Sequence, residues 1–95
     1  MDSKKAFGHA LRAVRVAKEL TQEDFAVVSS RTYLSSLERG MKSPTLEKIR
    51  RLTDRLDVHP LTLLTLYYSI KDGSSPKILL SAAQRELDEL EVAKR

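Results

Sequence analysis

The chain has 95 residues without a cysteine, of which 32% are charged, and a net charge of +4. This length predicts one small domain that buries roughly 60–65% of its unfolded surface, and the lack of cysteine excludes disulfides and thiolate metal sites. Because no stretch of about 18 residues is apolar enough to span a membrane, and the first residues lack the apolar core of a secretory signal, we expect a cytoplasmic protein without membrane contact.

The first predicted helix covers residues 4–18. Phe7, Leu11 and Val14 recur at helical spacing and give it an apolar stripe, and Arg15 lies at the flank of that stripe. We therefore expect the stripe to face the core.

Residues 21–40 predict two short helices joined by a turn. Thr21 is a natural N-cap for the first, and Ser29 or Ser30 offers a cap for the second. Gly40 is suited to a left-handed stop after the last turn.

The second of these helices, residues 31–38, has two contrasting sides. At 100° per residue, one side is formed by Ser30, Tyr33, Leu34 and Leu37. The other carries Thr32, Ser35, Ser36 and Arg39, with Arg31 at its shoulder. Because serine and threonine are poor helix formers, this outer side favours a role in recognition over one in helix stability.

Two further helices are predicted over residues 46–56, capped by Thr45, and over residues 61–69, preceded by Pro60. The second of these is apolar over about two-thirds of its circumference, which predicts burial on more than one side. We expect it to face another subunit; the alternative is that the C-terminal segment folds back over it.

A final helix is predicted from Pro76 over some 19 residues. Its narrow apolar stripe makes it marginal alone in water, so it must dock on its own domain or pair with its copy. We divide the chain into a helical domain, residues 1–71, and a linker with a C-terminal amphipathic helix, residues 72–95. The expected dimer interface consists of Leu63, Leu66, Tyr67, Ile70, Leu80, Leu87 and Leu90.

The positive charge lies in the first part of the chain. Residues 1–71 hold 13 Lys and Arg against 8 Asp and Glu, whereas residues 72–95 hold 4 against 5. This imbalance indicates a polyanionic partner for the first part, although many proteins carry a charge of this size.

Residues 11–64 resemble the phage-repressor, or Cro-like, helix-turn-helix family (the xenobiotic-response-element type). The matching segments are LRAVRVAKELTQEDFA at 11–26, SRTYLSSLERGMKSPTLEKIRRL at 30–52 and LDVHPLTLL at 56–64. The resemblance implies an all-α, compact five-helix domain that binds double-stranded operator DNA as a homodimer. The chain has about two fewer residues between Ala26 and Ser30 than members of the family usually have. This implies that the helix capped by Thr21 is shorter, or that the turn after it is tighter.

The resemblance also implies roles for single residues. Base-reading positions are Arg31, Thr32 and Ser36, with Ser35 on the same face; the alternatives are phosphate contact or contact through water. Expected phosphate contacts are Thr21, Gln22, Ser30, Arg39 and Lys42, where a local capping role for Gln22 and solvated charges are the alternatives. The resemblance pairs Arg15 with Glu38 as a structural ion pair. Tyr33 is expected to pack with a wet hydroxyl, and Lys48, Arg50, Arg51 and Arg55 to form a solvated face.

The sequence is compatible with three functions to different degrees. The first is a sequence-specific regulator of transcription, with no cofactor, that covers a promoter or touches RNA polymerase beside it. The second is an antitoxin-type module that binds a toxin partner and represses its own operon. The third, an enzyme, is poorly supported, because the sequence has no phosphate loop or carboxylate pair of usable spacing. His9 and His59 lack metal-ligand spacing, so we expect solvated or capping roles for them and no metal.

Overall fold

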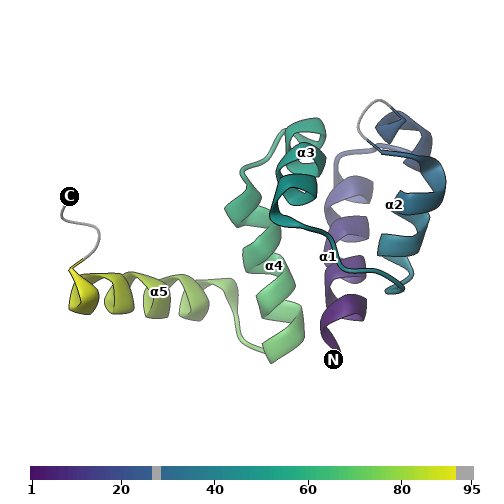
Figure 1. Ribbon diagram of the computed structural model, residues 1–95. Coiled ribbons are helices and arrows are strands. Elements are labelled where there is room, and N and C mark those ends of the chain that lie inside the picture. The colour runs from purple at the N-terminus through teal and green to yellow at the C-terminus, as the bar shows by residue number, and fades with distance from the viewer. Residues whose placement is uncertain (27–28, 92–95) are drawn as a thin grey trace.

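The computed structural model describes residues 1–26 and 29–91 of the chain (Figure 1). Its elements, in chain order, are α1 (Ser3–Ala17), the 3-10 helix η1 (Gln22–Phe25), α2 (Arg31–Glu38), α3 (Leu46–Leu56), α4 (Pro60–Asp72) and α5 (Pro76–Leu90). The predicted all-α class is confirmed, since the described residues contain helices and no strand.

Side-chain caps fix where most of these helices begin. The hydroxyls of Thr21, Ser30 and Thr45 each accept a hydrogen bond from a backbone N–H in the first turn of the helix that follows, as the sequence predicts. His59, for which the sequence allows a solvated or a capping role, caps α4: its Nδ1 accepts the N–H of Leu61 at 2.9 Å.

The predicted helix ends are less accurate than the starts. Gly40 has a φ of 74° and ends α2 in the expected left-handed conformation. The helix expected at 61–69 runs from Pro60 to Asp72. The last helix stops at Leu90, where Glu91 adopts a left-handed conformation, and the remainder of its predicted span lies outside the described residues.

The core lies where α1, η1, α2, α3 and α4 meet. Its largest fully buried side chains are Phe25, Leu11, Leu34, Leu37, Leu52, Leu56, Leu63 and Thr53. Leu63 corrects our sequence prediction. Its side chain is 0% exposed within one chain, because it points from α4 into this core, so it has no surface left to offer a second subunit.

Helix α5 projects sideways from the end of α4 and away from the rest of the molecule (Figure 1). It has no buried residue, and α4 is the described element against which it packs. The C-terminal helix therefore does not cover α4 as a lid would.

Helices α1 and α2 approach each other closely at Gly8. A Cβ at this position would lie 2.5 Å from the carbonyl oxygen of Glu38 and 2.6 Å from that of Leu37. Only a residue without a side chain allows the middle of α1 to touch the last turn of α2, so this glycine sets the distance between the two helices.

We predict that Gly8→Ala lowers the free energy of unfolding by about 1–3 kcal/mol, because the new methyl group would force two packed backbones apart. In an ordinary helix interior the same change raises stability by about 1 kcal/mol. Urea denaturation measures the difference. The neighbouring exposed His9→Ala is the control and should change stability by less than about 0.5 kcal/mol; a stabilised Gly8→Ala variant would contradict the close approach.

Candidate nucleic-acid interface

The helix-turn-helix unit begins with η1, which is a single 3-10 turn. A reciprocal pair of hydrogen bonds starts it: the Thr21 hydroxyl accepts the N–H of Asp24, and the Asp24 carboxylate accepts the N–H of Thr21 at 2.7 Å. This capping box stabilises a helix too short to hold itself. The four-residue length of η1 agrees with the first of the two expected outcomes, a shorter helix; residues 27–28 lie outside the described residues.

The capping hydrogen bonds lower the pKa of Asp24 below its ordinary value. The largest contributions come from the backbone N–H and the hydroxyl of Thr21, which both favour the ionised carboxylate. A carboxyl group with a depressed pKa in the folded state stabilises the fold above its unfolded pKa of about 3.9, and that stability is lost as the pH falls through the folded value.

We predict that Asp24→Asn removes part of the acid sensitivity of the protein. The wild-type chain should lose stability relative to the variant as the pH is lowered from about 5 to below 3.9, because only the wild type must protonate this carboxylate. Thermal unfolding across that range measures the effect. Asp57→Asn, at an exposed position outside the motif, serves as the control; parallel pH curves for wild type and Asp24→Asn would refute the assignment.

Arg15 and Glu38 hold α2 against α1 through a two-point contact. Arg15 Nε donates to Glu38 Oε2 at 2.6 Å, and Arg15 Nη2 donates to Glu38 Oε1 at 2.9 Å. The two side chains are only 12% and 5% exposed. The hydrogen bond to Glu38 is the largest cause of a raised pKa for Arg15, so the guanidinium stays charged throughout the working range.

The Arg15–Glu38 pair also bonds to residues at the start of the helix-turn-helix unit. Arg15 Nη1 donates to the carbonyl oxygen of Leu20 at 2.8 Å, just before the Thr21 cap. Gln22 Nε2 donates to Glu38 Oε1 at 3.2 Å. The ion pair therefore connects the end of α1, the start of η1 and the end of α2.

We predict that Arg15→Ala costs about 3 kcal/mol of unfolding free energy, because it leaves the Glu38 carboxylate buried without its partner. The double variant Arg15→Met with Glu38→Leu should be less destabilised, since it removes both charges and keeps apolar volume. Urea unfolding of Arg15→Met, of Glu38→Leu and of the double variant gives the coupling energy. Additive losses would show that the two side chains do not act as a pair.

The outward end of α2 carries the polar residues expected to read bases. The Arg31 side chain is 71% exposed, and Thr32 is exposed beside it. Arg31 Nη1 lies 3.4 Å from Glu23 Oε1, and both side chains are in solvent. An ion pair of this kind is weak, so Arg31 can exchange Glu23 for another acceptor at little cost.

The serines of α2 differ in their surroundings. Ser35 is half-buried, whereas Ser36 is 6% exposed. The predicted place of Ser36 on the outer face is wrong, because the eight-residue helix turns this position toward the body of the domain. Ser36 therefore has no surface from which to reach a base.

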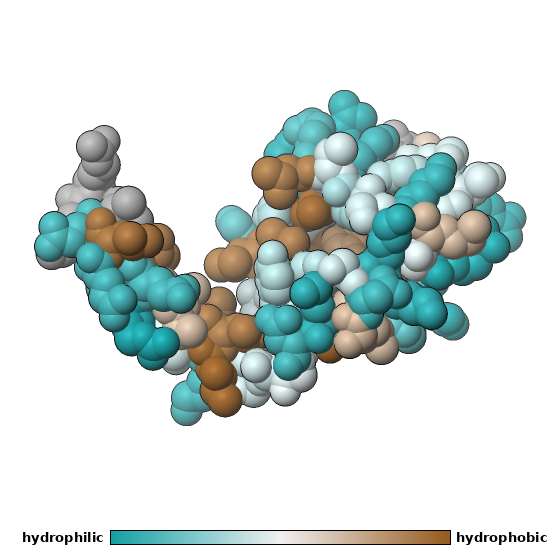
Figure 2. All heavy atoms as spheres, turned by 60° about the horizontal axis from the view of Figure 1, so that its bottom comes forward, coloured by the Kyte–Doolittle hydropathy of each residue, from teal (hydrophilic) through white to brown (hydrophobic). Residues whose placement is uncertain are grey.

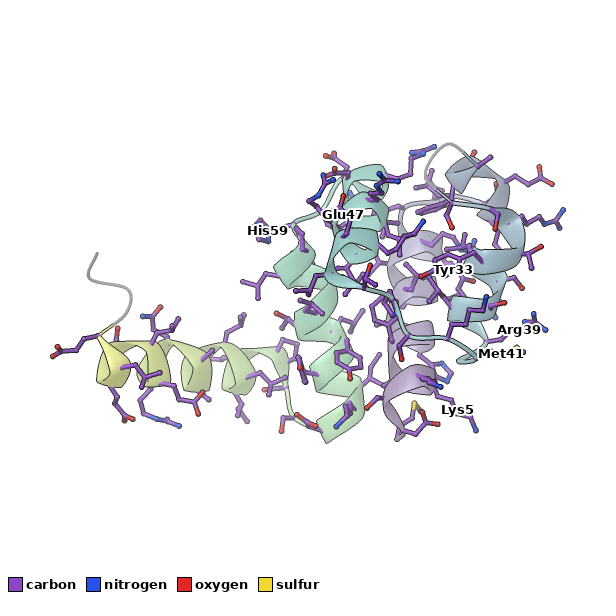
Figure 3. The ribbon with its side chains drawn as sticks, viewed as in Figure 1. Lys5, Tyr33, Arg39, Met41, Glu47 and His59 are labelled. Atoms are coloured by element: carbon purple, nitrogen blue, oxygen red, sulfur yellow. The ribbon has the colours of Figure 1, made fainter. Side chains whose placement is uncertain are left out.

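The residues predicted to contact phosphates lie around α2, and they differ in how far their polar groups are already bonded within the protein. The hydroxyls of Thr21 and Ser30 accept capping bonds, which leaves each O–H as a donor. The amide of Gln22 is bonded to Glu38 within the protein, the local role given above as the alternative. Arg39 points away from the domain (Figure 3), and its Nε donates a long hydrogen bond of 3.4 Å to the carbonyl oxygen of Ser35.

Sequence reasoning missed a cationic cluster beside α2. The ammonium groups of Lys42 and Lys48 lie 5.6 and 5.2 Å from the centre of the Tyr33 ring, which itself sits between α2 and α3 (Figure 3). Burial raises the pKa of the Tyr33 hydroxyl. Tyr33 and Lys48 are 15 residues apart, so no local sequence pattern connects them. Only the tertiary fold shows that Lys48 and Lys42 both lie near the Tyr33 ring.

Arg55 also departs from its expected place on a solvated face. Its Nε donates to the carbonyl oxygen of Asp24 at 2.8 Å, and its guanidinium lies 6.0 Å from the centre of the Phe25 ring. It is half-buried and connects α3 to the end of η1, so it positions the motif.

Two further observations concern the described residues. Within residues 1–26 and 29–91, no three His, Asp or Glu side chains come together in a way that could hold a metal ion. None of the helices in that part of the chain has the length and apolar character needed to cross a membrane.

Comparisons with known proteins agree with this geometry. A model described as helix-turn-helix matches residues 11–63. The uncharacterized HTH-type transcriptional regulator y4dJ of Sinorhizobium fredii (strain NBRC 101917 / NGR234) is 40% identical over 67 residues, covering 68% of this chain and 87% of the relative. The control protein C.BamHI of Bacillus amyloliquefaciens is 36% identical over 61 residues, covering 61% and 75%.

A solved structure extends the comparison to the fold. The restriction-modification controller protein C.AhdI from Aeromonas hydrophila matches with a TM-score of 0.59 at 38% sequence identity, over 62% of this chain and 92% of the controller. The chain therefore belongs to the helix-turn-helix family and is a DNA-binding regulator of transcription. More than a third of it has no counterpart in the controller structure.

Proposed function

We propose that this protein is a homodimer that recognises a pseudo-palindromic operator, with α2 of each copy in the major groove. The observation that carries the proposal is the exposed first turn of α2, where Arg31 and Thr32 stand free of the core. Major-groove recognition needs such donors and acceptors on the N-terminal turn of a helix. The two copies would place their α2 helices about 34 Å apart.

The neighbouring groups supply the contacts that orient this helix. Arg39 follows α2, and the pair Lys42 and Lys48 stands over Tyr33. Cations at these points suit phosphates on either side of the groove, which fix the position of a reading helix but carry no sequence information. The hydroxyls of Thr21 and Ser30 retain donors for the same purpose.

The direction of control follows from where the operator lies. A copy bound over a promoter represses it, and one bound beside polymerase activates it. The antitoxin reading is a second candidate, favoured by the exposed apolar and acidic α5. Co-purification of a small partner with the chain from its own host would favour this second candidate.

We predict that Arg31→Ala relaxes preference at one base position of the operator, by about 1–3 kcal/mol of discrimination. Lys42→Ala should instead weaken binding to all duplexes alike and reduce the salt dependence. Footprinting on DNA around the protein's own gene finds the site, and titration of base-substituted duplexes measures both effects. Thr45→Ser, which keeps the α3 cap, is a control that should bind normally.

The same titrations test the proposal as a whole. If each dimer holds six or more phosphates, affinity should fall by about 10³ or more between 50 and 200 mM salt. Identical behaviour of Arg31→Ala and Lys42→Ala would show that Arg31 is not the reader. Equal affinity for every duplex would reject sequence-specific control.

A further inference from the structure

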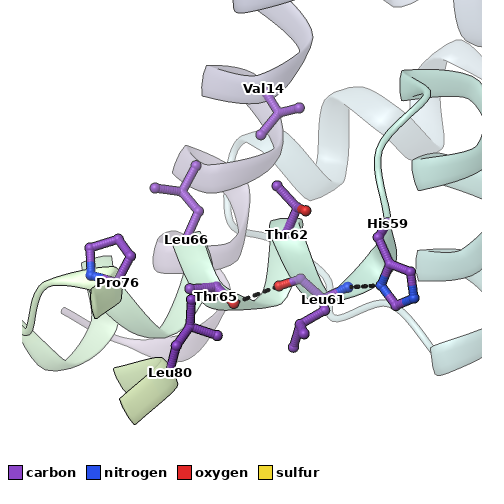
Figure 4. A pocket seen from close by; sticks show the side chains of 8 residues that line it. All are labelled: Val14, His59, Leu61, Thr62, Thr65, Leu66, Pro76 and Leu80. Atoms are coloured by element: carbon purple, nitrogen blue, oxygen red, sulfur yellow. Dashed lines mark hydrogen bonds between the residues drawn. The ribbon is translucent and has the colours of Figure 1, made fainter. Parts of the chain in front are cut away.

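The face of the molecule opposite α2 contains an apolar groove. A cavity of about 540 Å³ opens between the body and the start of α5, and its lining includes Val14 of α1, Leu61 and Leu66 of α4, and Leu80 of α5 (Figure 4). Figure 2 shows hydrophobic atoms on both sides of the notch between α5 and the body. A groove of this kind in water marks a site for an apolar partner.

Helix α5 carries an apolar stripe that its own chain only half covers. Leu79, Leu80 and Ala83 lie with α4 residues around a second, smaller cavity. Leu87 and Leu90, one and two turns further along the same stripe, are 41% and 70% exposed. The distal half of the stripe therefore lies beyond the reach of the body.

The direction of α5, which we call the arm, is fixed by contacts within the chain. Gly73 ends α4 with a φ of 73°, and Ser69 Oγ donates to the carbonyl oxygen of Ser74 at 2.6 Å across the turn. The Ser75 hydroxyl then caps α5. The arm is thus built to project and not to fold back over α4.

We propose that two copies exchange these arms: the distal half of each α5 lies in the α4/α5 groove of the other copy. The inference rests on the homodimer of the proposed function and specifies what joins the two copies. In a two-fold symmetric dimer each copy would cover both the groove and the distal stripe of the other, since each copy offers both surfaces.

The area required supports the use of both surfaces. A 15-residue helix is about 22 Å long and about 10 Å wide, so one of its faces presents a few hundred Å². A stable interface buries about 800 Å² on each partner. Pairing of α5 helices alone would fall short, and the α4 groove supplies the remainder.

The charges of the arm and the body are complementary. The distal half of α5 carries Arg85 against Glu86, Asp88 and Glu89, whereas residues 1–71 hold an excess of five positive charges. An exchanged arm adds its acidic end to a partner whose residues 1–71 carry the opposite net charge. This complementarity favours a second copy over an unrelated apolar peptide.

The oligomeric state of charged variants tests the exchange. Leu87→Glu places a carboxylate in the stripe without touching the core, and should shift the dimer to monomer by at least tenfold in the dissociation constant. Ser81→Glu, on the opposite side of α5, is the matched control and should leave the dimer intact. Sedimentation equilibrium measures both, and circular dichroism should show the same helix content as wild type.

Cross-linking identifies which surfaces meet. Because the chain has no cysteine, single cysteines can be placed cleanly: Thr62→Cys in the groove of one copy and Leu87→Cys on the arm of a second copy enlarged by a fused tag. A short bismaleimide should join the two in a product of mixed size. Ser81→Cys in place of Leu87→Cys should give several-fold less.

The outcomes separate this inference from the proposed function. A dimer that persists in Leu87→Glu, or a mixed product absent from the Thr62–Leu87 pair, overturns arm exchange and leaves the homodimer standing. A wild-type chain that stays monomeric while bound to its operator overturns both the exchange and the homodimer. Recognition of DNA by α2 is then decided separately by the Arg31→Ala titration.

Discussion

The ion pair of Arg15 and Glu38 is the interaction on which the rest of the site depends. It closes a ring of hydrogen bonds through Leu20 and Gln22, so that the end of α1, the start of η1 and the end of α2 meet at one nearly buried site. Burying two charges is expensive, and a pair of apolar side chains would have held the helices together as well. What apolar contact does not supply is direction: a planar guanidinium facing a carboxylate fixes orientation as well as distance. The pair therefore fixes the angle of α2.

Gly8, Arg15 and Arg55 together position α2. Gly8 permits the backbone of α1 to touch the last turn of α2, and Arg15, two turns later on α1, bonds to the side chain that ends α2. On the other side Arg55 joins α3 to the carbonyl oxygen of Asp24 in η1. All of these contacts lie behind or at the C-terminal end of α2. Its first turn has the Ser30 cap and the exposed Arg31–Glu23 ion pair, and Arg31 and Thr32 face the solvent.

The sequence predicts the helices well because caps and apolar spacing are local. Thr21, Ser30 and Thr45 begin helices as their side-chain chemistry requires, and the Arg15–Glu38 contact follows from the family resemblance. The failures come from tertiary packing. Ser36 and Leu63 each sit near the boundary between an inner and an outer side, where a rotation of the helix by a fraction of a turn decides burial. Lys48 and Arg55 find partners far away along the chain, and no local pattern could reveal them.

The eight-residue α2 is anchored at one end and exposed at the other, and this polarity has an evolutionary consequence. Changes at Arg31 and Thr32 touch neither the core nor the ring of hydrogen bonds, so under the proposed role of α2 new side chains there would alter what the protein recognises without altering how it folds. A lineage could move from one target sequence to another through folded intermediates at every step. The architecture keeps heritable variation in recognition apart from the residues that must remain constant.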